Sequence, residues 1–233
     1  MPVHPNEEEG PWAAGSLLAG LSPAQRKTLL ALGARRQYNA GDVLLAEGEN
    51  TTFAVIIIDG YVKITARTED GVESLLAIRT AGDIVGELAA LDSAPRSATA
   101  SAAGAVMTRV VSKAKLDECF RKDPGIAVGV NRAVAAKLRV ATRRRVDFRG
   151  RDARERLARA LLELCEGSAG LSPRGELKVF FTQSELAGLI GASEPTVHKA
   201  LRALRDARVV DTRYRRLVVT DIDRLRDIAE GAH

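Results

Sequence analysis

The chain has 233 residues, which is long for one domain and enough for two modest ones. Hydrophobic residues make up 45% and charged residues 28%, and the net charge of +5 permits a nucleic-acid partner without proving one. Cys119 and Cys165 lie far apart and outside any CxxC pattern, which excludes a disulfide framework or a cysteine-rich zinc site. No apolar run approaches the roughly 18 residues of a membrane span, so we expect a cytoplasmic protein without a membrane partner.

The first part of the chain is typical of an antiparallel β structure. Residues 1–15 are expected to form a flexible tail, and residues 16–123 the first domain. Ser22-Pro23 predicts the start of a helix. From Gly41 to about Val111, short β-prone runs such as FAVIIIDG alternate with turn signals, at the spacing of a sandwich or roll.

A helical pattern follows from Ser112. A short helix is expected to stop at Pro124, and residues 124–150 are expected to form a long dimerisation helix with a hinge at its end. Every third or fourth residue from Ala127 to Phe148 forms a narrow stripe, the spacing of a two-helix coiled coil. The predicted dimer seam comprises Val134, Leu138, Ala141 and Phe148. Alternatively, the helix packs on its own domain, and Arg145 in the stripe is a poor seam residue.

A new domain is expected over residues 151–233. Asp152 and Glu155 form a capping-box pattern just after the expected break. Thr182 with Glu185 forms another, and Gly191 supplies a sharp turn. Ser193 then caps a second helix that tolerates Pro195 in its first turn. This order predicts a helix-turn-helix, whose second helix enters the major groove of DNA.

The segment RVVDTRYRRLVVTD predicts two strands joined by a basic tip, the wing of a winged helix. A helical hairpin followed by an ordinary β-hairpin is the alternative. The predicted DNA-binding residues are Thr182, Ser193, Glu194, Pro195, Thr196, Lys199, Arg202, Arg213 and Arg215. Of these, Lys199 and Glu194 are expected to read bases, and the arginines to contact phosphates.

Two charges stand out in the apolar stretch GELAALDSAPRSATA, residues 86–100. We expect neither Glu87 nor Arg96 to pair along a helix with an opposite charge close in sequence. Buried charges are costly unless they are paired or bound, so a ligand is the expected partner of both.

Over residues 16–230 the chain resembles the CRP/FNR family of transcription regulators. The pattern G-E-L-A-x6-P-R-S-A resembles the phosphate-binding cassette of cyclic-nucleotide domains. The resemblance implies an α+β fold with an N-terminal cyclic-nucleotide-binding β-roll, a long dimerisation helix and a C-terminal winged helix-turn-helix. It also implies that Glu87 binds the ribose 2′-hydroxyl and Arg96 the cyclic phosphate. The further implied ligand contacts are Gly86, Leu88, Ala89, Ser97 and Thr142.

Two departures from the family pattern limit these expectations. The cyclic-AMP receptors carry two adjacent hydroxyl residues on the dimer helix, where this chain has Ala141 and Thr142. The choice between cyclic AMP, cyclic GMP and another effector therefore stays open. In the recognition helix, Glu194 and Pro195 replace the family's Arg-Glu pair, and Lys199 takes the place of its second base-reading arginine.

The leading hypothesis is a homodimeric, cyclic-AMP-responsive regulator that binds palindromic double-stranded DNA and works with RNA polymerase. The second is a DNA-binding regulator that is constitutive or answers to another effector. The third, a cyclic-nucleotide-controlled enzyme, is disfavoured because the second domain holds no catalytic set of Ser, His and Asp, metal cluster or phosphate loop. We expect no iron-sulfur cluster, haem or other metal, since the two cysteines lie in different domains and the roll has no His.

Overall fold

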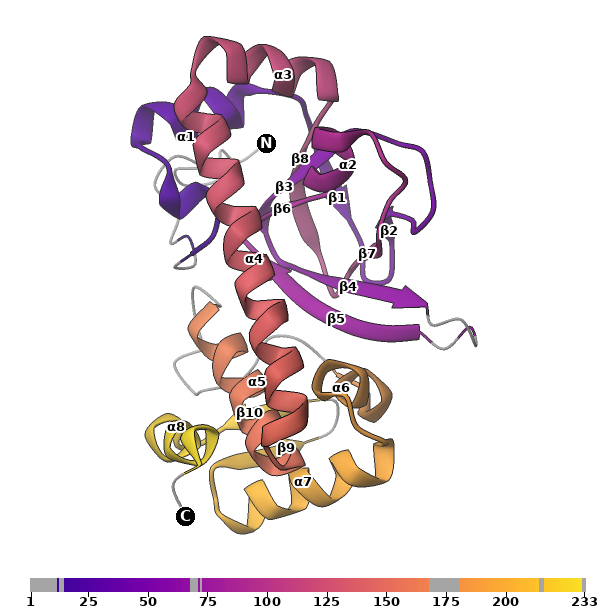
Figure 1. Cartoon of the computed structure of the whole chain (residues 1–233), viewed down its shortest axis with the longest axis vertical. Helices are drawn as coiled ribbons and strands as arrows, with labels where there is room; N and C mark the ends of the chain where they lie inside the picture. Colours follow the sequence, from indigo (N-terminus) through magenta and orange to yellow (C-terminus); the bar gives the residue numbers. More distant parts are fainter. Residues whose placement is uncertain are drawn as a thin grey trace. The chain divides into compact units, whose positions relative to one another are not determined.

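The computed structural model describes residues 12, 15–67, 71, 73–167, 181–213 and 216–231. Figure 1 shows the order of the elements along the chain. The helices are a 3₁₀ turn (Leu18–Gly20), α1 (Pro23–Ala31), α2 (Glu87–Asp92), α3 (Lys113–Lys122), α4 (Pro124–Gly150), α5 (Ala153–Gly167), α6 (Gln183–Ile190), α7 (Glu194–Asp206) and α8 (Ile222–Glu230). The strands are β1 (Ala34–Tyr38), β2 (Val43–Leu45), β3 (Ala54–Asp59), β4 (Tyr61–Arg67), β5 (Glu73–Thr80), β6 (Ile84–Val85), β7 (Thr99–Ala102), β8 (Val106–Val111), β9 (Val210–Arg213) and β10 (Arg216–Val219).

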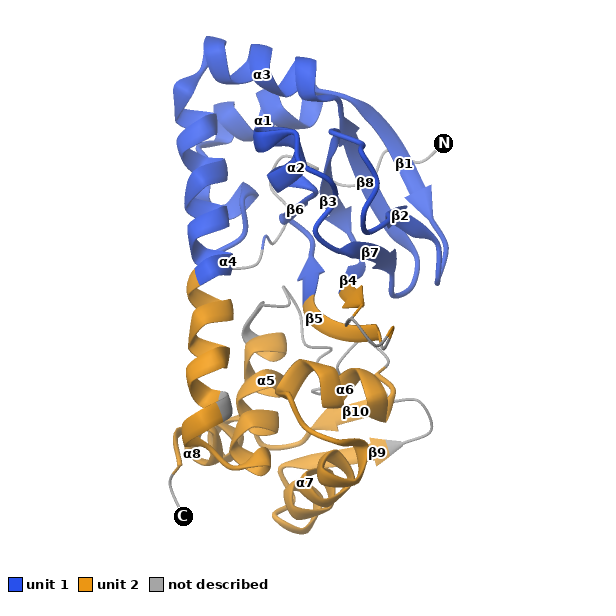
Figure 2. Cartoon of the chain, turned by 45° about the vertical axis from the view of Figure 1, so that its right-hand side comes forward, with its two compact units in different colours: residues 1–64, 78–138 blue, residues 65–77, 139–233 orange. Residues whose placement is uncertain are grey.

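The chain divides into two compact units, residues 1–64 with 78–138 and residues 65–77 with 139–233 (Figure 2). The expected α+β class is confirmed, with a β-roll, a long helix and a winged helix-turn-helix in chain order. The domain boundaries proposed from the sequence stay predictions.

The β-roll is built from two four-stranded sheets, in the orders β1-β8-β3-β6 and β2-β7-β4-β5. Strand β3 is buried on both faces, because successive side chains of a strand point to opposite sides. Val55 and Ile57 face a core between the sheets, together with Leu45, Val62 and others. Ile56 and Ile58 face a second core on the outer side of β3. This double burial explains the continuous apolar run in the sequence.

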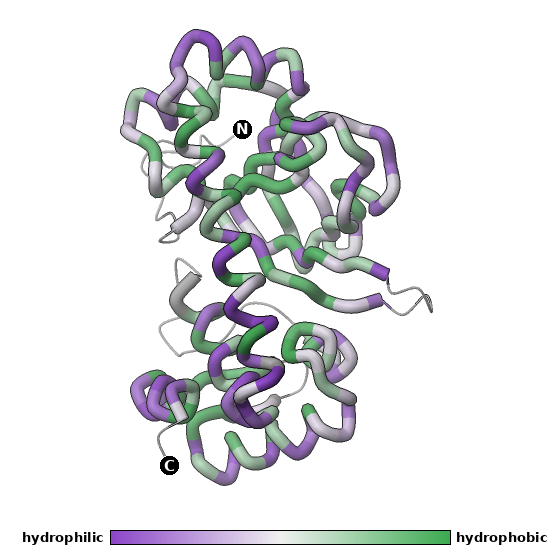
Figure 3. The backbone as a smooth tube through the Cα atoms, in the orientation of Figure 1, coloured by the Kyte–Doolittle hydropathy of each residue, from purple (hydrophilic) through white to green (hydrophobic). Residues whose placement is uncertain are grey.

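Helices α1, α3 and α4 contribute Leu29, Leu116 and Ile126 to that second core, which covers β3 and β6. Trp12, the only tryptophan of the chain, packs against the same core. The hydropathy colouring shows β3 as hydrophobic and α3 as alternating between hydrophilic and hydrophobic positions (Figure 3). The amphipathic pattern of α3 is what lets one face of the helix join the core while the other meets water.

The long helix α4 ends at Gly150, as the sequence predicts, and a short break separates it from α5. The capping bond at the new start is present, since Asp152 Oδ1 accepts from the Glu155 amide at 2.8 Å. Just before the break, the Asp147 carboxylate contacts Arg151 at 3.3 Å and Arg159 at 3.4 Å. Both arginines also donate to the carbonyl of Ala229 at the end of α8, at 3.1 Å.

The second unit packs α5 against α6, α7 and α8, with β9 and β10 forming an antiparallel ribbon. Helix α8 was not predicted from the sequence. It begins at the N-cap Asp221, whose carboxylate accepts from the Arg224 amide at 2.9 Å, and it buries Leu225 and Ile228. Strand β1 was also missed, because ARRQY carries four exposed residues and lacks an apolar alternation.

Candidate functional site

The cassette begins where β6 turns into α2. Gly86 is the N-cap of α2 and has a φ of 74°, a left-handed conformation that side chains other than glycine rarely adopt. A Cβ on Gly86 would lie 2.6 Å from Arg96 Nη1 and 2.8 Å from Leu45 Cδ1. Glycine is therefore required here both by the backbone and by the close approach of Arg96.

Glu87 is 6% exposed and has a partner that the sequence did not reveal. Lys137, fifty residues later on α4, places its Nζ 2.8 Å from Glu87 Oε1. The same ammonium also donates to the carbonyl of Ile84. The expectation that only a ligand could partner Glu87 is therefore wrong, because a charge distant in sequence reaches it across the fold.

Arg96, which is 4% exposed, is held by three hydrogen bonds from its guanidinium. Its Nε donates to Thr51 Oγ1 at 3.0 Å, its Nη1 to the Gly86 carbonyl at 2.8 Å and its Nη2 to the Phe53 carbonyl at 2.6 Å. The guanidinium carbon also lies 4.8 Å from the centre of the Phe53 ring. The expectation that Arg96 lacks protein partners is wrong too, since these acceptors fix its position.

These contacts still leave binding capacity at the cassette. A guanidinium has five N–H donors, so two remain on Arg96 after its three bonds within the described part of the chain. Glu87 keeps Oε2 free of the Lys137 contact, which uses Oε1. The amides of Leu88 and Ala89 lie in the first turn of α2, where a helix provides no acceptor. Together these groups offer N–H donors to an anion beside one buried carboxylate.

Ser97 and Thr142, the remaining residues predicted to contact the ligand, lie in different environments. Ser97 follows Arg96 directly and is exposed, which leaves its hydroxyl accessible. Thr142 is exposed on the part of α4 that belongs to the second unit. Their roles in ligand binding stay predictions.

Burial shifts the ionisation of the charges around the cassette. It lowers the pKa of Lys137, against the opposing effect of Glu87. It also lowers the pKa of Arg96, against the effects of Glu49 and Glu87. The carboxyl of Asp83 has a raised pKa, again mainly because of burial. In all three groups burial is the largest cause of the shift, so the charges around the cassette are surrounded by little water.

The second candidate site is the helix-turn-helix. Thr182 Oγ1 accepts from the Glu185 amide at 3.1 Å, and Glu185 Oε2 accepts from the Thr182 amide at 2.8 Å, which confirms the predicted capping box of α6. Gly191 ends α6 with a φ of 60°, as the turn requires. Ser193 is the N-cap of α7, but its hydroxyl bonds Thr196 Oγ1 at 2.8 Å and makes no capping bond to an amide.

Helix α7 separates its two faces as predicted. Val197, Leu201 and Leu204 are buried in the domain. The exposed residues of the helix include Glu194, Pro195, His198, Lys199 and Arg202, while Thr196 is half-buried. Pro195, Lys199 and Arg202 recur at helical spacing on one face, which can lie along a groove of DNA.

The wing is present as the antiparallel pair β9 and β10. Arg213 is the last residue of β9, and its side chain lies outside the described part of the structure, as does Arg215 altogether. The hydroxyl of Thr212 on β9 accepts from Arg205 Nη1 of α7 at 3.1 Å, which ties the wing to the second helix.

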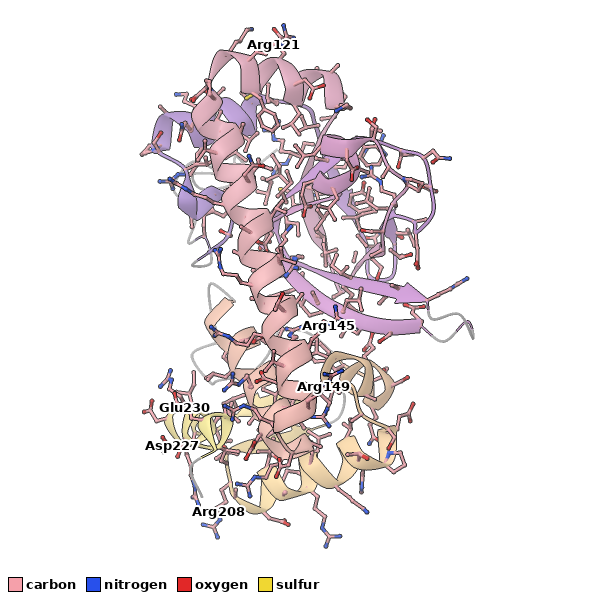
Figure 4. All side chains as sticks on the ribbon, viewed as in Figure 1. Arg121, Arg145, Arg149, Arg208, Asp227 and Glu230 are labelled. Carbon is pink, nitrogen blue, oxygen red and sulfur yellow. The ribbon has the colours of Figure 1, made fainter. Side chains whose placement is uncertain are left out.

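The predicted dimer seam lies on a helix with exposed apolar side chains. Leu138 is 65% exposed and Ala141 is also exposed, whereas Val134 is half-buried. Phe148 lies in the last turns of α4, but its side chain is outside the described residues. Arg145, the poor seam residue, is exposed on α4 (Figure 4).

Within the described residues, no three or more His, Cys, Asp or Glu side chains gather where they could hold a metal ion. None of the described helices is both long and apolar enough to cross a membrane.

Two protein-family models match the parts of the chain that contain these two sites. Residues 35–123 match the model of the cyclic nucleotide-binding domain, and residues 155–228 match the Crp-like helix-turn-helix domain. The fold and the two sites thus define a ligand-responsive DNA-binding regulator.

The relatives extend over nearly the whole chain. A CRP-like cAMP-activated global transcriptional regulator of Mycobacterium tuberculosis is 31% identical over 215 residues, which cover 91% of this chain and 96% of the relative. This chain belongs to the CRP/FNR family of transcriptional regulators.

Two solved structures share the fold. A CRP/FNR-family regulator from Thermus thermophilus has a TM-score of 0.72 and 25% identity, covering 86% of this chain and 100% of the other. The c-di-GMP responsive global regulator CLP of Xanthomonas campestris has the same TM-score and coverage at 21% identity.

Proposed function

We propose that the chain is a homodimeric transcription regulator that binds cyclic AMP in the roll and palindromic DNA through α7 and the wing. The observation that carries the proposal is the cassette. It combines the buried Glu87 with the fixed guanidinium of Arg96, which keeps two N–H donors for a phosphate. The cAMP-activated M. tuberculosis relative supports cyclic AMP as the effector.

The ligand contacts follow from the two charged groups. Arg96 binds the cyclic phosphate, because a guanidinium forms short charge-assisted bonds to phosphate oxygens. Glu87 accepts from the ribose 2′-hydroxyl. Lys137 holds the Glu87 carboxylate in place. The ligand thus contacts Glu87, and Glu87 contacts Lys137 on α4, the proposed dimer helix. This pair gives a route from the ligand to the dimer.

Calorimetric titration with cyclic AMP and 2′-deoxy-cyclic AMP tests the ligand contacts. The wild type should bind the deoxy ligand about tenfold more weakly, the effect of losing a hydrogen bond to a charged group. In Glu87→Ala the two ligands should bind alike, because the acceptor is gone. Absence of wild-type binding at millimolar concentration would reject the cyclic-nucleotide proposal, and an unchanged preference in Glu87→Ala would reject the role of Glu87.

For DNA binding, the proposal separates base reading from phosphate contact. Lys199 donates to guanine, and Glu194 accepts from a cytosine amino group. Arg202, Arg213 and Arg215 contact phosphates. The two-fold symmetry of a dimer places half-sites about one helical turn apart.

Selection from random duplexes tests this division. Lys199→Ala should relax the preference at one base pair, with a loss of about 1–3 kcal/mol of discrimination. Arg213→Ala should weaken binding to all sequences and reduce the salt slope by about one unit. If Arg213→Ala alters the selected motif and Lys199→Ala does not, the wing reads the bases and the roles are reversed.

A regulator that answers to another effector is the second candidate. Ala141 lacks a hydroxyl that the cyclic-AMP receptors use, and a protein of the same fold is described as c-di-GMP responsive. The titration above, repeated with cyclic GMP and cyclic di-GMP, distinguishes these effectors.

We further infer that the chain works in the cytoplasm with RNA polymerase. We also infer that it carries no catalytic activity or metal, because binding accounts for both the cassette and the helix-turn-helix.

A further inference from the structure

A cavity of about 410 Å³ lies in the first unit, beside strands β1, β2 and β8 and the start of α3. Its lining includes no residue of the segment from Gly86 to Ser97. The volume is within the range of sites that bind small molecules, roughly 300–1,000 Å³. The proposed function gives this cavity no role.

Two solvent-exposed cations lie at this cavity. Arg36 on β1 and Lys115 on α3 both line it, and neither side chain has an ion pair or hydrogen-bond partner among the described residues. Neighbouring cations are engaged, since Lys113 contacts Asp117 at 3.6 Å and Arg35 donates to Met107 Sδ. An anion bound in the cavity would gain an attraction to each of these two exposed cations.

The rest of the lining suits a ligand with an apolar body. Leu44 is 6% exposed, and Val110 and Phe53 are half-buried at the cavity. Tyr38 also lines it, and a phenolic hydroxyl can donate to an anion while its ring contacts apolar atoms. An apolar wall with a few convergent polar groups is the usual composition of a small-molecule site.

We propose that this cavity binds a small organic anion, with a carboxylate or phosphate group held by Arg36 and Lys115 and an apolar body against Leu44, Val110 and Phe53. The site is separate from the cyclic-nucleotide cassette and needs no cyclic nucleotide to form. It gives the regulator a second input of different chemistry.

Phe53 connects the two sites. It lines the cavity, its carbonyl accepts from Arg96 Nη2 at 2.6 Å, and its ring lies under the Arg96 guanidinium. A ligand in the cavity therefore contacts the residue that positions Arg96. Any effect of this ligand on binding at Arg96 must be matched by an equal effect of the Arg96 ligand on binding in the cavity, because coupling between two binding sites is reciprocal.

The test uses three probes on the full-length protein: phenyl phosphate, inorganic phosphate and phenol. Amide NMR spectra should show phenyl phosphate shifting Tyr38, Leu44 and Val110. Phenyl phosphate should bind at least about tenfold more tightly than either of the other two probes, because only it has both the anion and the apolar body. Shifts confined to residues 86–97, or no shifts at millimolar probe, would overturn the site. Equal affinity for inorganic phosphate would overturn the ligand class.

Charge-matched variants complete the test. Arg36→Gln/Lys115→Gln should weaken phenyl phosphate binding about tenfold or more, because both contacts to the anion are lost. Arg121→Gln/Arg132→Gln removes the same total charge from exposed positions that do not line the cavity; Arg121 points away from the fold at the end of α3 (Figure 4). This control should bind as the wild type does. Equal losses in both variants would show a general effect of charge and overturn the proposal.

Discussion

The contact between Lys137 and Glu87 makes each residue dependent on the other. The two side chains are 17% and 8% exposed. Lys137→Met should lower the free energy of unfolding by about 1–3 kcal/mol, because it leaves a buried carboxylate without its cation; fully buried pairs lose about 3–5 kcal/mol in this way.

Urea unfolding of Lys137→Met, of Glu87→Gln and of the double variant Glu87→Gln/Lys137→Met measures the energetic coupling between the two side chains. The double variant should recover most of the loss, since neither partner is then an unpaired charge. Additive losses in the double variant would show that the two side chains act independently.

Asp83 should reduce stability at neutral pH. Burial raises the pKa of its carboxyl, so the folded protein holds the proton more tightly than the unfolded chain does. Stability is therefore lost as pH rises from about 4, the pKa of an unfolded aspartate, through the raised value in the fold. Asp83→Asn should be more stable than the wild type at pH 7, by about 1.4 kcal/mol for each unit of the shift, and no more stable at pH 3.5.

Thermal unfolding across this pH range checks the Asp83 prediction. Asp42→Asn is the matched control, because Asp42 accepts from an amide three residues back, as Asp83 does, but on an exposed turn. A gain in Asp42→Asn equal to that in Asp83→Asn would contradict burial as the cause.

At the level of single residues, the sequence identified Glu87 and Arg96 as special but not their partners. The cassette is a local pattern, so its spacing is visible in the sequence. Lys137 and Thr51 lie 50 and 45 residues away from their partners, and only the folded roll brings them together. A lysine on a long basic helix carries no signal that distinguishes it from its exposed neighbours.

Among the elements, the two helices of the helix-turn-helix begin differently. Thr182 makes a complete capping box, whereas the Ser193 hydroxyl bonds only the hydroxyl of Thr196. Thr182→Ala should therefore cost about 1 kcal/mol of stability, the usual effect of losing an N-cap. Ser193→Ala should cost less than half as much.

Urea unfolding of these two variants without DNA gives the comparison, which keeps any role in DNA binding out of the result. A larger loss in Ser193→Ala than in Thr182→Ala would show that Ser193 caps α7 in solution.

Helices whose ends carry a capping residue or a glycine turn were predicted correctly. Ser22, Thr182 and Gly191 each mark a helix end by local chemistry, and the structure confirms all three. Strand β1 was missed because its stability comes from pairing with β8, where Arg35 lies opposite Arg109. Pairing between strands about seventy residues apart is set by the whole roll and leaves no local pattern.

For the whole molecule, α4 provides the proposed dimer contact. Leu138→Glu should convert the dimer into a monomer at micromolar concentration, because a charge would be buried without a partner in the seam. Sedimentation velocity measures this change. Val128→Glu is the control on the same helix, since Val128 is 47% exposed but outside the predicted stripe. A dimer that survives Leu138→Glu and dissociates in Val128→Glu would place the interface on another face of α4.

The position of Trp12 has a practical consequence for spectroscopy. Because it is the sole indole and packs against the core of the first unit, selectively excited tryptophan fluorescence reports on that unit alone. Circular dichroism in the far ultraviolet, by contrast, records the helices of both units. When the protein is heated, the two signals should coincide only if the units melt together. An emission shift that trails or precedes the loss of ellipticity would show that the roll and the winged helix unfold as separate cooperative blocks.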